Sequence, residues 1–80
     1  MFTVYILYSK SLDRYYTGHT ANIDDRFLRH NKGRGKATKA GIPWTLVHTE
    51  IFESKSSAYK RELEIKAKKS RMYIEKLIAG

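Results

Sequence analysis

The first half of the chain contains two short stretches whose hydrophobic pattern predicts β-strands. Residues 2–8 (FTVYILY) are apolar or aromatic at both even and odd positions, which is typical of a central strand covered on both faces. Residues 9–14 are polar and turn-forming, and aromatic strand character resumes at 15–18. We therefore expect an antiparallel hairpin whose loop is longer than two residues.

A third strand is predicted over residues 44–52 (WTLVHTEIF), directly after Pro43. Strict alternation divides this strand into two faces, with Trp44, Leu46, His48 and Glu50 on one and Thr45, Val47, Thr49 and Ile51 on the other. The second face is apolar or neutral, so we expect it to point inward.

Three helices follow from capping residues and apolar spacing. Asn22 precedes a helix that is expected to bury Ile23, Phe27 and Leu28, to direct Arg26, Arg29 and His30 elsewhere, and to end at Gly33. Ser54 is a cap for a helix over about 55–69, and Ser70 starts a short terminal helix. The predicted fold class is α+β, a small three-stranded antiparallel sheet flanked by helices in the order β-β-α-β-α-α, in a single domain over 1–80.

Composition excludes several classes of protein. The 80 residues include no cysteine, which excludes disulfides and cysteine-based zinc sites. The N-terminus has no basic region and only a short apolar run, so we expect neither a signal peptide nor a membrane span. A cytoplasmic location is the default expectation.

Positive charge is concentrated in two regions. The net charge is +8, and residues 21–40 hold six basic and two acidic residues, while 61–80 hold six basic and three acidic residues. Such clustering is typical of proteins that bind a polyanion, although it also occurs on surfaces that only confer solubility. The candidate nucleic-acid contacts are Arg29, Lys32, Arg34, Lys36, Lys39, Lys66 and Lys69.

Two features suggest chemistry at a phosphodiester. Arg26 and His30 lie four residues apart on a predicted helix, and Tyr16 precedes that helix, so a cation, an imidazole and a phenol are expected together. Glu62 falls on the same helical stripe as the apolar residues Ala58 and Ile65, where a carboxylate is costly unless it is paired or bound to a metal. An ion pair with Arg26 or another basic residue and ligation of Mg²⁺ are both open.

The ordered set of these residues resembles the GIY-YIG nuclease family over nearly the whole chain. Thr3-Val4-Tyr5 stands where the family has Gly-Ile-Tyr, and Tyr16-Thr17-Gly18 stands where it has Tyr-Ile-Gly. Arg26, His30 and Glu62 follow in the expected order. The resemblance is greatest to small stand-alone bacterial members, which are related to the catalytic half of nucleases acting on branched DNA.

The resemblance implies a metal-dependent endonuclease that hydrolyses DNA, including branched or damaged DNA. It implies that Tyr16 acts as the general base, assisted by Tyr5. Arg26 would stabilise the negative charge of the transition state, and His30 would contact the scissile phosphate or the attacking water. His19 would assist the phenol, and Glu62 would hold Mg²⁺ or Mn²⁺. The alternatives are a non-catalytic nucleic-acid-binding module and a nuclease subunit that depends on a protein partner for affinity.

Overall fold

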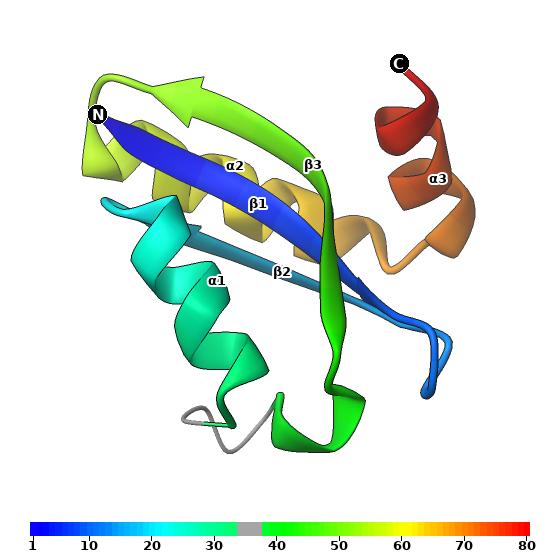
Figure 1. Ribbon diagram of the computed structural model, residues 1–80. Coiled ribbons are helices and arrows are strands. Elements are labelled where there is room, and N and C mark those ends of the chain that lie inside the picture. Colours follow the sequence, from blue (N-terminus) through cyan, green and yellow to red (C-terminus); the bar gives the residue numbers. More distant parts are fainter. Residues whose placement is uncertain (34–37) are drawn as a thin grey trace.

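The computed structural model describes residues 1–33 and 38–80 and has the predicted α+β architecture (Figure 1). The elements, in chain order, are β1 (Phe2–Ser9), β2 (Arg14–Thr20), α1 (Ile23–Asn31), the short 3-10 helix η1 (Lys39–Gly41), β3 (Trp44–Phe52), α2 (Lys55–Lys68) and α3 (Arg71–Ala79). Apart from the 3-10 turn, this is the predicted order β-β-α-β-α-α. Among the described residues, no helix is long and apolar enough to cross a membrane.

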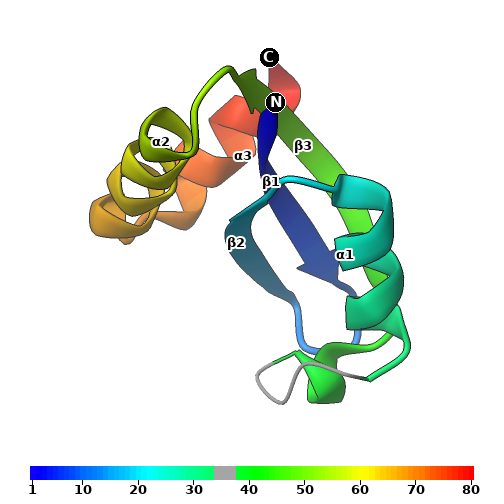
Figure 2. The same cartoon turned by 90° about the vertical axis from the view of Figure 1, so that its left-hand side faces the viewer.

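The three strands form one antiparallel sheet in the order β2-β1-β3. The apolar strand β1 is central, as its two apolar faces predicted. Helix α1 lies on one face of the sheet, and α2 and α3 lie on the other (Figure 2). Strand β2 is therefore an edge strand flanked by α1 and α2, and this arrangement positions the candidate site.

Each face of the sheet has its own apolar cluster, and alternation along β1 separates them. Tyr5 and Leu7 pack with Trp44 and with partly buried residues of α1. Val4, from the opposite face of β1, packs with Ala58 and Ile65 of α2. All six of these side chains are 5% exposed or less, so both faces of the central strand are sealed from water.

The helices begin at the predicted caps. The side chains of Asn22, Ser54 and Ser70 accept hydrogen bonds from backbone N–H groups three residues later, at 3.1, 3.1 and 3.2 Å. These bonds satisfy donors that the first turn of a helix leaves without partners. Helix α1 also carries Asp24 and Asp25 in its first turn, where the helix dipole favours acids.

The predicted inner face of β3 is wrong because a bulge interrupts the alternation. The pairing register shifts between Ile6 and Leu7, which lie opposite His48 and Leu46. Leu46 therefore shares the α1 side of the sheet with Leu7, whereas His48 shares the α2 side with Ile6. Ile51, which was expected to point inward, is 64% exposed.

The predicted stripe of α1 is also partly wrong. Leu28 is 52% exposed, whereas His30 is only 6% exposed. Ile23, Phe27 and His30 have the i, i+4, i+7 spacing of one helix face, and Leu28 lies away from that face. The imidazole is tolerated inside because the surrounding structure provides partners for both of its nitrogens.

Candidate active site

Two phenols lie side by side on the α1 face of the hairpin. In the β1–β2 register Tyr5 lies opposite Gly18 and Leu7 lies opposite Tyr16, so both tyrosines point to the same face. Their ring centroids are 6.4 Å apart. A Cβ atom at Gly18 would lie 2.6 Å from the Tyr5 hydroxyl, so the Tyr5 ring can cross the edge strand only where no side chain intervenes.

His30 links the Tyr5 phenol to the end of the loop that follows α1. Its Nε2 lies 3.0 Å from the Tyr5 hydroxyl, and its Nδ1 lies 2.9 Å from the Thr38 hydroxyl. The ring also makes an edge contact with Tyr16, at 5.1 Å between centroids. His30 is thus held on three sides at the centre of the α1 face.

The pKa values of this pair determine where the protons lie. Burial and the neighbouring Tyr16 raise the pKa of Tyr5 to about 12, although the charge of Arg26 opposes this shift. Burial and the positive charge of Arg26 lower the pKa of His30. At neutral pH the Tyr5 phenol therefore keeps its proton and the His30 imidazole is neutral, so one ring nitrogen can donate a hydrogen bond and the other can accept one.

A second set of hydrogen bonds holds the end of α1 against the start of β3. The Asn31 side chain accepts a bond from the Trp44 backbone N–H at 2.6 Å and donates one to its carbonyl at 3.1 Å. The Trp44 indole N–H donates to the Thr38 carbonyl at 2.7 Å. Residue pattern alone did not predict the roles of Asn31 and Thr38, because a polar residue in a last helical turn or in a loop carries no signal of burial.

Arg26 occupies the first half of α1 and lines a hollow of about 320 Å³ together with His19, Asn22 and Lys55. It is partly exposed and makes no ion pair with an acid among residues 1–33 and 38–80. Its charge nevertheless acts on both Tyr5 and His30. An unpaired guanidinium at the mouth of a hollow is suited to binding an anion.

Glu62 approaches the same strand from the opposite face of the sheet. Its side chain is 11% exposed and receives hydrogen bonds from His19 Nδ1 and from Lys66 Nζ, each at 2.6 Å. Burial acts to raise the pKa of Glu62, but these two donors outweigh it and lower the pKa below its usual range. The carboxylate is thus ionised, and its ion-pair partners are Lys66 and His19 rather than Arg26.

The two halves of the site meet at the β2 edge. Lys66 Nζ, bound to Glu62, also lies 6.0 Å from the centroid of the Tyr16 ring. The charge of Glu62 contributes to the raised pKa of Tyr5, which is on the other side of the sheet. His19 contacts Glu62 and the ring of Tyr59, and its described bonds do not involve Tyr16.

The donor set fits a hard divalent cation that takes few protein ligands. No group of three or more His, Cys, Asp or Glu side chains occurs among the described residues, which is unlike a zinc-type cage. Glu62 provides one ionised carboxylate, and two positively charged or proton-donating groups already occupy its oxygens. Mg²⁺ needs only one or two carboxylates when water and phosphate complete its shell.

The predicted nucleic-acid contacts that the structure describes lie on the protein surface, and Lys66 and Lys69 line a hollow beside β2. Arg29 is 55% exposed and pairs with Asp25 at 3.5 Å. Lys32, Lys39, Lys66 and Lys69 are exposed. Arg34 and Lys36, which were also expected to contact nucleic acid, lie outside the described residues.

Similarity to known proteins agrees with this geometry. The family model for the GIY-YIG catalytic domain matches residues 1–76. The chain belongs to the GIY-YIG family. A GIY-YIG catalytic domain is a nuclease domain, and such nucleases typically use divalent metals. The predicted family is therefore confirmed.

Relatives of similar size lie within the same family. The chain is 47% identical over 77 residues to a UPF0213 protein of Natronomonas pharaonis. This alignment covers 95% of the chain and 88% of the relative. It is 48% identical over 64 residues to a UPF0213 protein of Staphylococcus haemolyticus, with 79% of this chain and 77% of the relative covered. These names state no activity.

A solved structure has the same fold. The solution NMR structure of a UPF0213 protein from Bacillus halodurans superimposes with a TM-score of 0.61 at 40% sequence identity. The match covers 99% of this chain and 84% of that one. The GIY-YIG arrangement of hairpin, helices and third strand is therefore shared with an experimentally determined relative.

Proposed function

We propose that this protein is a metal-dependent endonuclease that hydrolyses phosphodiester bonds in DNA, including branched or damaged DNA. One observation carries the proposal: two phenols, a neutral histidine and an unpaired arginine on the α1 face meet an ionised glutamate from α2 at the exposed edge of β2. Each of these groups has a use in cleaving a phosphodiester.

Arg26 binds the phosphate. Its guanidinium offers a planar pair of donors that matches two phosphate oxygens, and it stabilises the negative charge that builds on them as water attacks. Its positive charge is available because no acid of the described residues pairs with it. His30 stays neutral and holds the Tyr5 phenol in place through Nε2.

Tyr16 is the phenol that takes the proton from the attacking water. Tyr5 keeps its own proton, because burial raises its pKa to about 12. The Lys66 ammonium lies 6.0 Å from the centroid of the Tyr16 ring, so a positive charge stands beside this phenol. The water oxygen then forms a bond to phosphorus as the bond to the leaving oxygen breaks.

Glu62 would hold the divalent ion, Mg²⁺ or Mn²⁺, which supplies a Lewis acid for the phosphate oxygens and acidifies a bound water. His19 orients the Glu62 carboxylate through its 2.6 Å hydrogen bond. Lys66 neutralises the same carboxylate and is exposed enough to turn toward a phosphate instead.

The test is cleavage of labelled single-stranded, duplex, flap and four-way-junction DNA with Mg²⁺, Mn²⁺ or EDTA. Glu62→Ala is expected to abolish cleavage while leaving DNA affinity unchanged or higher, because a carboxylate repels phosphate. Glu64→Ala is the matched control, since Glu64 is on the same helix and 57% exposed. Metal-dependent cleavage that survives Glu62→Ala would refute the role of Glu62.

The second candidate is a non-catalytic DNA-binding module, or a subunit that cleaves only when a protein partner adds affinity. The observation in its favour is that Lys66 and His19 already satisfy Glu62, as in a structural ion pair. Binding to every substrate without cleavage by the wild-type protein would support this candidate. Cleavage restored by a co-purifying protein would identify the subunit.

A further inference from the structure

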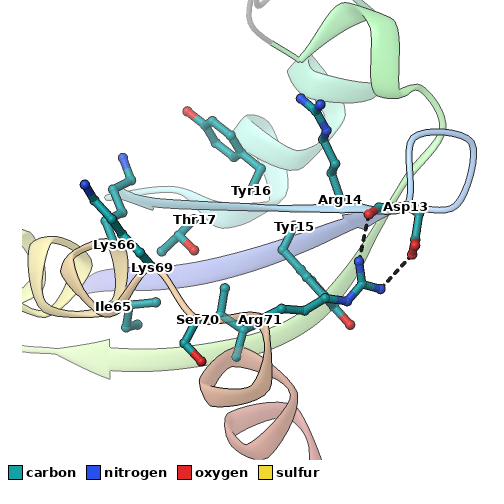
Figure 3. Close-up of a pocket in the computed structure, with 11 residues that line it drawn as sticks. Asp13, Arg14, Tyr15, Tyr16, Thr17, Ile65, Lys66, Lys69, Ser70 and Arg71 are labelled. Carbon is teal, nitrogen blue, oxygen red and sulfur yellow. Dashed lines mark hydrogen bonds and ion pairs between the residues drawn. The ribbon is translucent and has the colours of Figure 1, made fainter.

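A second cleft adjoins the candidate active site on the α2 side of the hairpin (Figure 3). It has a volume of about 410 Å³, within the usual range of roughly 300–1,000 Å³ for ligand pockets. One wall is β2 from Arg14 to Thr17, and the other is the junction of α2 and α3. The catalytic roles described above use only Tyr16 and Lys66 from this cleft, and Lys69 has been named only as a predicted backbone contact.

The cleft combines a cationic rim with an apolar floor. Arg14, Lys66, Lys69 and Arg71 line it, together with Ile65 and Ile74. The one acid, Asp13, is already bound by the Tyr8 hydroxyl and by Arg71, both at 2.6 Å. Arg14 and Lys69 make no ion pair with any acid in the described part of the chain.

The end wall of the cleft is formed by contacts between the hairpin turn and the start of α3. The Arg71 guanidinium lies 5.2 Å from the centroid of the Tyr15 ring and also donates to the Asp13 carbonyl at 2.9 Å. Tyr15 packs against Tyr8 at 5.0 Å between ring centroids. These contacts connect the hairpin turn to the start of α3 at one end of the cleft.

Lys66 connects the cleft to the candidate active site. It lines the cleft, binds Glu62 at 2.6 Å and lies 6.0 Å from the Tyr16 ring centroid. In Figure 3 the Tyr16 phenol and the Lys66 ammonium extend on the same side of β2. A DNA strand whose scissile phosphate lies beside Tyr16 would therefore continue directly into the cleft.

We propose that this cleft is a subsite for one nucleotide of the DNA strand, next to the scissile phosphate and with its base turned out of the base stack. The base lies against the apolar floor, and the unpaired cations Arg14 and Lys69 hold its phosphate. A nucleotide has a flat, largely apolar base and a charged phosphate, which match the apolar floor and the cations of the cleft. A bare phosphate would leave the apolar floor without a contact. This inference rests on the proposed function.

The test is an NMR titration of backbone amide shifts without any metal, so it does not depend on cleavage. The probes are thymidine 5′-monophosphate, deoxyribose 5-phosphate and the trinucleotide d(TTT). Thymidine monophosphate is expected to shift amides of residues 15–17 and 70–74 and to bind at least about five-fold tighter than the sugar phosphate, because the base makes apolar contacts. The trinucleotide is expected to bind tighter still and to shift Arg26.

Variants of the cleft separate the base contact from the charge. Ile74→Phe, which fills the floor, is expected to remove the advantage of the nucleotide over the sugar phosphate. Lys69→Gln alters an exposed side chain and is expected to weaken all three probes several-fold. Lys60→Gln, an exposed lysine of α2 outside the cleft, is the control and is expected to leave binding unchanged.

Three results would overturn the proposal. Equal affinity for the nucleotide and the sugar phosphate would show a surface that binds only phosphate. Weaker binding of the trinucleotide than of the mononucleotide would show a site for free nucleotides. If Lys60→Gln weakened binding as much as Lys69→Gln does, the affinity would depend on the net positive charge of the protein and not on the cleft. If the cleft binds the nucleotide as expected but the protein cleaves none of the DNA substrates, the proposed nuclease activity would be refuted while the nucleotide subsite would stand.

Discussion

At the scale of single residues, the site depends on which polar groups are buried and what they contact. His30 is the clearest case, since sequence spacing placed it outside while its contacts with Tyr5 and Thr38 hold it inside. The two tyrosines Tyr5 and Tyr16 could be picked out from the sequence, because the tripeptides that contain them follow each other in an unusual order. The partner of His30 could not, because Thr38 stands eight positions further along the chain and no periodic pattern relates the two residues.

The burial of His30 predicts a pH dependence of stability. Its pKa is lowered from the ordinary value of 6.5, so the unfolded chain binds a proton more readily than the folded protein does. Its contribution to stability is complete above about pH 6.5 and is lost as pH falls through the lowered folded value. Thermal denaturation between pH 7.5 and 5 measures this loss.

The control for that measurement is His30→Gln, which cannot titrate. Its melting temperature is expected to be lower than that of the wild type at pH 7.5 and to change less between pH 7.5 and 5. Identical slopes for the two proteins would show that His30 is not the titrating group.

At the scale of elements, local signals predicted where helices begin and missed how one strand alternates. Three caps were recognised because Asn22, Ser54 and Ser70 stand directly before helical patterns. The bulge in β3 was missed, because the extra residue appears only in the pairing with β1. A bulge is a property of two strands, whereas a cap is a property of a few consecutive residues.

The cap of α1 has a consequence for the site, because Arg26 is the residue whose backbone N–H binds the Asn22 carbonyl. Asn22→Ala removes the 3.1 Å side-chain bond to the Asp25 N–H and is expected to cost about 1 kcal/mol of unfolding free energy. Asn22→Asp, which keeps the acceptor, is the control and is expected to stay near wild type. Urea denaturation measures both, and equal losses would argue against the cap.

At the scale of the whole molecule, positive charge comes from elements on both faces of the sheet. The chain has a net charge of +8, and the described candidate contacts come from α1, η1, α2 and the residues that follow these helices. The distribution of charge along the chain could be read from the sequence, but its division between the two faces of the sheet could not, since it requires α1 and α2 to lie on opposite faces (Figure 2).

This charge predicts a steep dependence of DNA binding on salt. Each phosphate neutralised contributes about −0.9 to the slope of log affinity against log salt on duplex DNA. Lys32→Gln and Lys39→Gln are each expected to reduce the magnitude of that slope by about 1, for every DNA sequence alike. Fluorescence anisotropy from low to moderate salt measures the slope, with Lys60→Gln as the unchanged control. If neither Lys32→Gln nor Lys39→Gln changed the slope, the DNA would not contact these two lysines.

The division of the site between two apolar clusters links activity to complete folding. Tyr5 belongs to the cluster under α1, whereas Glu62 extends from the helix that packs on Val4. Loosening either cluster would withdraw half of the groups from the β2 edge. A chain still emerging during synthesis, or one that has partly opened, would then be unable to cut. For a protein proposed to cleave DNA, the layered architecture would act as a built-in safeguard for the genome.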